Sequence, residues 1–264
     1  MREVPRYDRF CYRGKSSSYC VLIPVLNEAG KIEKQLQAMQ EIAERFDVII
    51  ADGGSSDGSL TDDFLSSVNV RAKLVKTGPG KLSAQMRMAL DYAMEEAYLG
   101  FIFMDGNNKD NPEAIARFAS KLSEGYDHVQ GSRFIEGGKH ENTPLSRHIA
   151  IRALHAPLIS LAARFKYTDT TNGFRAYSRK FISDSRVQPF REIFSKYELH
   201  YYLAIRAARL GFRVIEIPVE RIYPASGKVP TKITGLRGYG LVMKTLLQAC
   251  LGVFNPKKKE ENHV

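Results

Sequence analysis

Residues 103–112, FMDGNNKDNP, place an acidic side chain directly after an apolar run. Asp105 ends the run, and Asn107 and Asp110 follow within five residues. Hard divalent cations such as Mg²⁺ and Mn²⁺ take carboxylate and amide oxygens, which makes Asp105 and Asn107 candidate metal ligands. The alternative is a plain turn at the end of a strand. Asp110 could join the same site, but we favour a role in capping the next helix.

Other polar residues also follow apolar runs. Asp52 precedes two glycines and Asp57, so it either accepts hydrogen bonds from a nucleobase or caps a tight turn. Arg133, in QGSRF, either holds a phosphate group bidentately or lies on the surface. Lys81 and Arg87 come after a Gly-Pro-Gly turn and are weaker candidates for phosphate binding.

Alternating strands and helices must position these residues. Apolar runs predict strands at 19–28, 47–52, 70–77, 100–105 and 126–133, and helical spacing lies between them, as at 29–45 and 81–97. This order predicts a single domain of α/β class, with a doubly wound, mostly parallel (mixed) sheet flanked by helices. Such sheets bind ligands at the carboxyl ends of their strands, where the polar residues fall.

Composition limits the possible partners. The chain has 264 residues, enough for one large core, and a net charge of +10 that favours nucleic acid, an anionic membrane or a phosphate-rich substrate. Three cysteines without a pairing pattern favour a reducing compartment. The N-terminus is polar, so we expect no signal peptide, and no apolar run reaches the ~20 residues of a membrane span.

Two apolar segments carry basic fringes, at 146–166 and at 240–254, and the second leads into a lysine-rich tail. Each is typical of a helix in the interface of an anionic membrane leaflet. Each also fits an ordinary core helix with a basic solvent face. The pattern alone leaves both interpretations open.

Five motifs occur in a recognisable order: PVLNE at 24–28, ADGGSSDGS at 51–59, MDGN at 104–107, GSRF at 131–134 and DTTNGFRAY at 169–177. Together they resemble the family 2 glycosyltransferases with the GT-A fold. The closest branch is the polyprenol-phosphate sugar transferases of the dolichol-phosphate mannose synthase type. The resemblance covers roughly residues 20–235. It implies a GT-A domain at 20–235; the sequence pattern outside that range predicts an N-terminal arm at 1–19 and a C-terminal amphipathic helix and basic tail at 236–264.

The resemblance also implies roles for single residues. The nucleotide-sugar donor would be bordered by Pro24, Asn27, Glu28 and Asp52, and a divalent metal (Mg or Mn) would be held by Asp105 and Asn107. Phosphate groups would be bound by Arg133, Arg147 and Arg221, and the set of substrate-binding candidates is completed by Lys81, Arg175 and Lys228. Two positions depart from the family pattern: Gly53 replaces an Asp, and Gly227 separates Ser226 from Lys228.

The implied reaction is an inverting transfer of a sugar, with Asp105, Arg133 and Asp169 as candidate catalytic residues. A polyprenyl phosphate acceptor is already ionised and attacks unaided. A glycan hydroxyl, as in surface-polysaccharide synthesis, needs a general base, for which Asp169 and Glu198 are candidates. We favour structural roles for both carboxylates. The polyprenol-phosphate branch favours a cytoplasmic protein bound peripherally at the membrane face.

A non-catalytic nucleotide-binding or nucleic-acid-binding module is the remaining alternative. Basic residues are dispersed along the chain, Trp is absent, and no nucleic-acid motif is present. We therefore expect no nucleic-acid partner.

Overall fold

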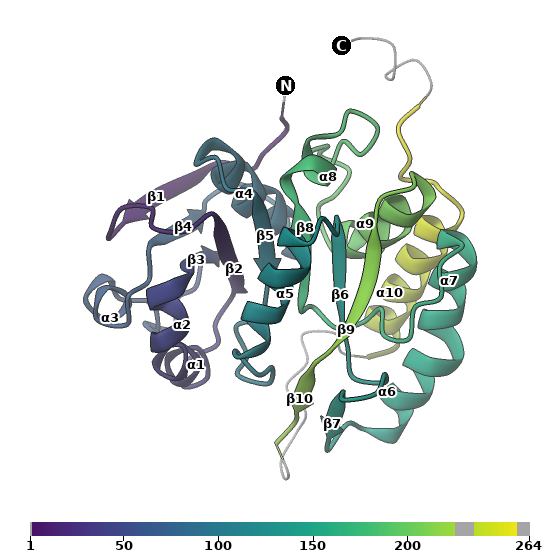
Figure 1. The fold of residues 1–264 in the computed structure, drawn as a ribbon, viewed down its shortest axis with the longest axis horizontal. Helices are drawn as coiled ribbons and strands as arrows, with labels where there is room; N and C mark the ends of the chain where they lie inside the picture. The colour runs from purple at the N-terminus through teal and green to yellow at the C-terminus, as the bar shows by residue number, and fades with distance from the viewer. Residues whose placement is uncertain (1, 225–234, 258–264) are drawn as a thin grey trace.

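The computed structural model describes residues 2–224 and 235–257, and a sheet of eight strands forms the centre of this part (Figure 1). From one edge to the other the strands are β1 (Tyr7–Cys11), β4 (Ala72–Lys76), β3 (Asp47–Asp52), β2 (Tyr19–Val25), β5 (Gly100–Phe103), β8 (Arg175–Ser178), β6 (His128–Ser132) and β9 (Val214–Pro218). Strands β4, β3, β2 and β5 are parallel, as are β6 and β9. Strand β8 runs antiparallel to both β5 and β6 and joins the two parallel parts.

Helices cover both faces of the sheet (Figure 1). One apolar core lies under α1 (Ile32–Ala38), α2 (Gln40–Arg45), α3 (Asp62–Ser67) and α5 (Ala114–Ser123). The other lies under α4 (Leu82–Glu95), α7 (Ala156–Ala163), α8 (Arg179–Ser183), α9 (Glu198–Arg209) and α10 (Gly235–Cys250). All six residues of β3 are buried, as its unbroken apolar sequence requires of a strand covered on both faces. The predicted doubly wound α/β fold is confirmed.

The N-terminal segment, expected as an arm over residues 1–19, contributes a strand to the sheet. Strand β1 pairs antiparallel with β4, beginning with Tyr7 opposite Lys76. Its residues are mostly exposed, because an edge strand is paired on one side only. The strand therefore lacks the apolar run that marks the others in the sequence, and the expected arm does not hold for residues 7–11.

The segment expected to be helical at 146–166 forms one continuous rod. It consists of α6 (Leu145–Ala150), a π-helical turn η1 (Ile151–His155) and α7, and it ends at Arg164 in the left-handed conformation, φ 55°. The helix expected at 240–254 is α10. Within residues 2–224 and 235–257, no helix has both the length and the apolar character needed to cross a bilayer.

Strand order reverses between β2 and β5, because β3 and β4 continue to one side of β2 and β5 lies on the other. In open α/β sheets such a switch point forms a crevice at the carboxyl ends of the strands. A short second sheet, in which β7 (Lys139–Glu141) pairs parallel with β10 (Glu220–Ile222), lies below this edge in Figure 1. It brings the C-terminal part of the chain to the loop after β5.

The expected capping role of Asp110 is wrong. Helix α5 begins at Ala114 without any side-chain cap, and its N-cap residue is Glu113. The Asp110 carboxylate instead pairs with Arg221 of β10, Oδ2 to Nη1 at 2.5 Å. Because the Asp110 side chain is fully buried, a cationic partner stabilises it better than a helix end does.

Candidate active site

A cleft of about 880 Å³ opens at the carboxyl ends of the central strands. Its size is usual for a small-molecule or cofactor site, roughly 300–1,000 Å³. Most of the residues expected to bind substrate or metal line it: Pro24, Glu28, Lys81, Asp105, Asn107, Arg133, Arg147, Arg175 and Arg221. The fold therefore gathers these distant parts of the sequence in one place.

Some expected residues do not line the cleft. Asn27 and Asp52 bond to the loop after β3, and Asp169 pairs with Arg133, which does line the cleft. Arg87 is buried away from the cleft and donates from Nε to the Phe194 carbonyl at 2.9 Å. Ser226 and Lys228 lie outside the residues that the structure describes.

Asp105 follows β5, and its side chain is 30% exposed to the cleft. Oδ2 accepts from Arg221 Nη2 at 2.9 Å and from Asn107 Nδ2 at 3.4 Å. Burial raises the pKa of this carboxyl, but nearby groups, with the Arg221 guanidinium first and His200 and Lys109 after it, together hold the pKa below its usual value. A Cβ at Gly173 would lie 2.3 Å from Asp105 Oδ1, so any side chain at position 173 would displace the carboxylate.

Arg221 bridges two carboxylates, with Nη1 on Asp110 and Nη2 on Asp105. Burial raises the pKa of Asp110 in spite of the neighbouring guanidinium. Removing one member of such a buried set leaves an uncompensated charge, which typically costs about 3–5 kcal/mol. Because its ion pair with Asp105 is costly to break, Arg221 holds the Asp105 carboxylate in position.

The side-chain oxygen of Asn107 has no hydrogen-bond partner in the described part of the structure. Its Oδ1 is buried, and no donor contacts it among the residues that the structure describes. An amide oxygen beside the Asp105 carboxylate suits a hard divalent cation. In the described residues, no three His, Cys, Asp or Glu side chains gather in metal-binding geometry. A cation here would therefore take most of its ligands from a diphosphate and water.

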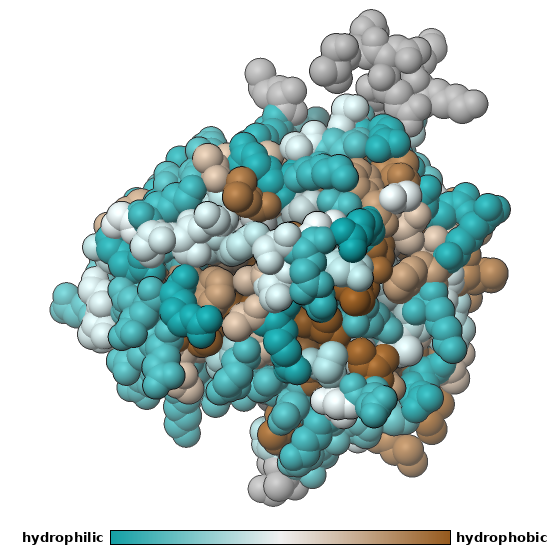
Figure 2. Space-filling view, in the orientation of Figure 1, coloured by the Kyte–Doolittle hydropathy of each residue, from teal (hydrophilic) through white to brown (hydrophobic). Residues whose placement is uncertain are grey.

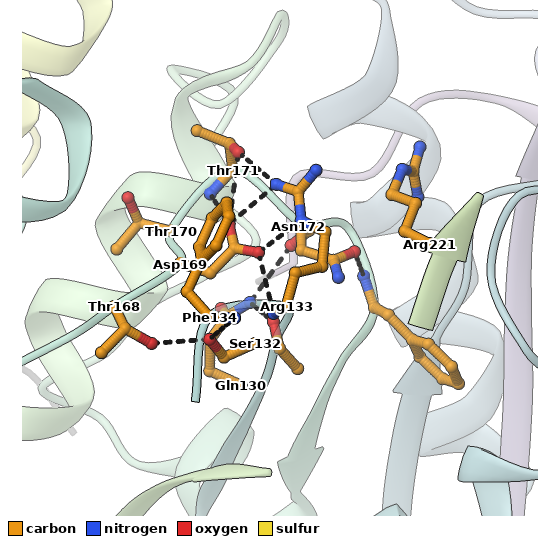
Figure 3. A network of polar contacts seen from close by, with 12 residues as sticks. Gln130, Ser132, Arg133, Phe134, Thr168, Asp169, Thr170, Thr171, Asn172 and Arg221 are labelled. Carbon is orange, nitrogen blue, oxygen red and sulfur yellow. Dashed lines mark hydrogen bonds and ion pairs between the residues drawn. The ribbon is translucent and has the colours of Figure 1, made fainter. Parts of the chain in front are cut away.

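Arg133 is held at the end of β6 by Asp169, as Figure 3 shows. Its Nε and Nη2 donate to Asp169 Oδ2 and Oδ1 at 2.6 and 3.0 Å, and Nη2 also donates to Thr171 Oγ1 at 3.0 Å. Nη1 is buried and unpartnered among the described residues. Burial would lower the pKa of Arg133, but the Asp169 carboxylate raises it above its usual value. Asp169 thus orients Arg133 so that Nη1, with its two N–H groups, is left for a ligand in the cleft.

The turn that carries Asp169 is held from behind by Glu216 on β9. The Glu216 carboxylate accepts from the backbone N–H groups of Thr168 and Asp169 and from Thr168 Oγ1, at 2.8–3.1 Å. Thr168 Oγ1 also lies 2.6 Å from Ser132 Oγ (Figure 3). Glu216 was not predicted from the sequence, where a lone Glu in a strand carries no motif.

Arg175 stabilises the turn that carries Asp169 by donating hydrogen bonds to backbone carbonyls. Its guanidinium donates to the carbonyl oxygens of Thr170, Asn172 and His200 at 2.6–3.1 Å. With all three nitrogens donating to carbonyls, Arg175 shapes the turn; it also lines the cleft, and its expected contact with substrate stays a prediction.

The opposite wall consists of the loops after β2 and β3. Asp52 Oδ1 accepts from the N–H groups of Gly54 and Ser55 and from Ser55 Oγ, at 2.7–3.1 Å. Asn27, in the left-handed conformation, φ 49°, joins the two loops by accepting from Ser56 N at 2.8 Å. A Cβ at Gly53 would lie 2.9 Å from Gln85 Nε2, so a larger residue at position 53 would have to displace the Gln85 amide.

A third wall is largely apolar. It is formed by Ala150 and Ile151 of the α6–η1 rod, Tyr197 and Tyr201 at α9, and Val242 of α10. His155 and His200 also face the cleft. Burial lowers the pKa of both, for His200 to about 3, so both imidazoles are neutral at physiological pH.

The cleft as a whole favours an anion with an apolar part. Among the described residues that line it, seven are Lys or Arg and only two are Asp or Glu, so the lining attracts negative charge. Buried polar atoms of Asn107, Arg133, His155, Thr170 and His200 lack partners in the described structure. Native interiors rarely leave such atoms unpaired, so a ligand is expected to pair with several of them.

Comparison with known sequences gives the family. The sequence profile described as Glycosyl transferase family 2 matches residues 20–186, which is more than half of the chain. The chain belongs to glycosyl transferase family 2. It is a nucleotide-sugar-dependent glycosyltransferase, as the motifs predicted.

Two curated relatives are distant. The chain is 30% identical over 207 residues to an undecaprenyl-phosphate mannosyltransferase of Micrococcus luteus, a match that covers 75% of this chain and 81% of the relative. It is 26% identical over 230 residues to the glycosyltransferase AglJ of Haloferax volcanii, which covers 86% of this chain and 70% of the relative.

Solved structures share the fold. Glucosyl-3-phosphoglycerate synthase of Mycobacterium tuberculosis, in complex with phosphoglyceric acid, superposes with a TM-score of 0.62 at 18% identity, covering 91% of this chain and 81% of that one. Another structure of the same synthase, with a TM-score of 0.60, contains Mn²⁺, uridine diphosphate and phosphoglyceric acid. The GT-A fold expected from the motifs is confirmed.

Proposed function

We propose that this family 2 enzyme transfers a sugar from a nucleotide diphosphate sugar to a polyprenyl phosphate at the cytoplasmic face of a membrane. A phosphate oxygen of the acceptor forms the new bond to the anomeric carbon. The bond from that carbon to the donor diphosphate breaks, and the nucleoside diphosphate leaves with the electron pair. Attack opposite to the leaving group inverts the configuration.

The observation that carries the proposal is that the continuous helical rod α6–η1–α7 borders the cleft on one side and exposes apolar side chains on the other. Ser146, Arg147, Ala150, Ile151 and His155 line the cleft. The same rod exposes large apolar side chains: Leu145 is 73% exposed, Ile149 54% and Leu161 80%. One element thus borders the site of chemistry and an apolar outer surface, which suits an acceptor whose head reacts and whose chain stays in lipid.

Basic residues flank that outer surface. Arg152, Arg164 and Lys166 are all exposed around the apolar residues of the rod. Figure 2 shows apolar surface at the margin of the molecule over α7. Basic residues beside apolar ones favour binding to the anionic cytoplasmic leaflet, at about 1 kcal/mol for each Lys or Arg near the surface. We therefore propose peripheral attachment by this rod.

The carboxylates of the site favour an acceptor that is already ionised. Glu28 and Asp105 are the carboxylates that line the described part of the cleft, and Asp105 is tied to Arg221. Asp169 is fully buried against Arg133, and Glu198 accepts from the Lys196 N–H instead of facing the cleft. Neither expected base is positioned to take a proton from a sugar hydroxyl, whereas a phosphate needs no base.

We assign the donor to the switch point between β2 and β5. Pro24, Glu28 and Lys81 line the cleft there, with Asn27 and Asp52 holding the loops in shape. Arg133 Nη1, Arg147 and Arg221 lie where phosphate oxygens can be bound. Negative charge builds on the diphosphate as it leaves, so fixed cations there stabilise the transition state more than the ground state.

A divalent cation, Mg²⁺ or Mn²⁺, is part of the proposal. Asp105 and the unpartnered Oδ1 of Asn107 would hold it. When bound, the cation would neutralise charge on the leaving diphosphate. The Mn²⁺ and uridine diphosphate in the related synthase support this assignment.

Nucleotide release tests the function. The purified protein is offered UDP-, GDP- and TDP-sugars, each with undecaprenyl phosphate, with an oligosaccharide acceptor, or alone. We expect release from one donor that depends on the lipid phosphate. Release that depends only on the oligosaccharide would replace the acceptor by a glycan hydroxyl, and no release from any donor would contradict the proposal.

A further inference from the structure

Lys109 is a largely buried basic residue of the cleft, next to the loop residues that would hold the metal. It lies in the loop after β5, is only 7% exposed, and lines the cleft. Within residues 2–224 and 235–257, no hydrogen bond or ion pair reaches its Nζ; its recorded contact is with an aromatic ring. The side chain is largely buried, and an ammonium held among protein groups is costly unless it is paired, so we expect a ligand in the cleft to supply its partner.

The backbone around Lys109 is held firmly. The Lys109 carbonyl accepts from Ile222 N at 2.9 Å, and Asn108 N donates to Gln35 Oε1 at 2.7 Å. Asp110, the next residue, is clamped by Arg221. The backbone that carries Lys109 is therefore fixed by bonds to two other elements, α1 and β10.

Tyr223 gathers three cations at one ring. Lys109 Nζ lies 4.9 Å from the ring centroid, and the Cζ atoms of Arg147 and Arg221 lie at 5.7 and 5.8 Å. Arg147 also donates to the Tyr223 hydroxyl at 3.0 Å. Of the three cations, Arg221 alone has carboxylate partners in the described residues. With the two carboxylates on Arg221, the cluster has three cations and two anions, a formal charge of +1. Neither Lys109 nor Arg147 has a carboxylate of its own in the described residues, which suits an anionic ligand.

We propose that the Lys109 ammonium, seated on the Tyr223 ring, binds phosphate oxygens in the cleft. Those oxygens belong to the donor diphosphate or to the acceptor phosphate, an identification that rests on the proposed function. Charge-assisted hydrogen bonds from a fixed ammonium are strong, because the group needs no reorganisation to meet the anion. Lys109 thereby supplies, next to Asp105, a positive charge that is part of the chain itself.

Calorimetric binding of inorganic pyrophosphate tests this role without any assumed substrate. The titration is done in EDTA at low salt with the wild type, Lys109→Gln, Lys109→Arg and Lys180→Gln. Lys180 is the matched control, since its side chain is 78% exposed and lies outside the cleft. We expect the affinity to fall about 10- to 100-fold in Lys109→Gln, from the loss of a charged hydrogen bond. Lys109→Arg should lose less affinity than Lys109→Gln, because it keeps the positive charge.

Pyrophosphate that fails to bind the wild type, or that binds Lys109→Gln as tightly as the wild type, overturns the proposal. A Tyr223→Leu variant keeps it testable if Lys109→Gln unfolds. We expect Tyr223→Leu to weaken pyrophosphate binding about threefold or more, because it removes the aromatic ring that contacts the Lys109 ammonium. Unchanged affinity in that variant contradicts the role of the ring.

Steady-state kinetics then distinguishes the two sources of phosphate. A raised KM for the nucleotide sugar in Lys109→Gln assigns the ammonium to the donor, and a raised KM for undecaprenyl phosphate assigns it to the acceptor. A fall in kcat with both KM values and pyrophosphate affinity unchanged overturns phosphate binding by Lys109. Absence of transfer in the wild type would contradict the proposed function, while the pyrophosphate titration would still decide the role of Lys109.

Discussion

The two polar walls of the cleft are held together by different kinds of contact. In the loops after β2 and β3, Asp52 bonds groups two and three residues away, and Asn27 reaches the neighbouring loop. On the other wall Arg221 pairs with Asp105 across 116 residues, and Arg133 pairs with Asp169 across 36. The first wall is built from neutral backbone donors, and the second from buried opposite charges.

This difference predicts different responses to mutation. A turn held by several N–H donors loses about 1 kcal/mol when one acceptor is weakened. A buried ion pair that loses one partner leaves a charge that nothing compensates, at about 3–5 kcal/mol. We therefore expect substitutions in the charged wall to reduce stability and activity strongly, and substitutions in the loop wall to reduce them only slightly.

The largest effect is expected from Asp105→Asn. The substitution keeps the shape of the side chain but removes the charge that pairs with Arg221 and the proposed metal ligand. We expect the rate of nucleotide release to fall by about 10³-fold, as when a transition-state contact is lost. Asp63→Asn, on the exposed surface of α3, is the control and should keep full activity. Turnover above a tenth of the wild-type rate in Asp105→Asn would remove Asp105 from the mechanism.

Asp169→Asn separates a positioning residue from a general base. Loss of the carboxylate frees Arg133 in a buried site, so we expect the free energy of unfolding to fall by about 3 kcal/mol and kcat by about 100-fold. Denaturant unfolding and the pH dependence of kcat/KM are measured together. If Asp169 only positions Arg133, the acidic limb of the pH profile keeps its shape. Disappearance of that limb would instead identify Asp169 as the base.

His128 makes the half of the sheet under the charged wall sensitive to acid. Burial, and then the nearby Arg175, lower its pKa from 6.5 to about 3 in the folded protein. The unfolded chain therefore binds more protons between pH 6.5 and 3, and the folded state loses stability as the pH falls through this window. At pH 5 the loss relative to neutral pH should be about 2 kcal/mol.

His128→Phe should remove that loss, because Phe keeps the packing on Tyr177 but does not titrate. Urea unfolding of both proteins at pH 7 and pH 5 measures the effect. The same pH dependence in the two proteins would rule out His128 as its source.

Asp52→Asn should have the smallest effect. The Asn amide oxygen can still accept from Gly54 and Ser55, so we expect a loss of about 1 kcal/mol in unfolding free energy. The KM for the donor should rise only a few-fold. Thermal unfolding and donor titration check both values. A loss as large as that of Asp169→Asn would abolish the distinction between the two walls.

The fold was largely predictable because its strands are marked locally. Runs such as DVIIAD are buried on both faces and show this in their composition. Strand β1 was missed since an edge strand needs no apolar run. The short β7–β10 pair was missed because its strands of three residues carry no periodicity.

The site was predictable to the extent that each residue follows a strand. Asp105, Arg133 and Asp52 were found in this way. The partners of Asp105 and Asp110 were not, because Arg221 reaches them only through the pairing of β10 with the loop after β5. Lys109 was not predicted as a site residue for a related reason. The polar sequence NNKD is typical of an exposed turn, and only contacts with distant segments bury Lys109.

The position of β8 sets the order in which the sheet can be completed during synthesis. Strand β8 pairs with both β5 and β6 but is made after both, ending at Ser178. At about 5–20 residues per second, the ribosome needs roughly 4 to 15 seconds to go from the end of β5 to the end of β8. Throughout that interval one edge of β5 has no partner. Nascent chains are then most exposed to pairing with one another, and a chaperone that covers this edge would protect them.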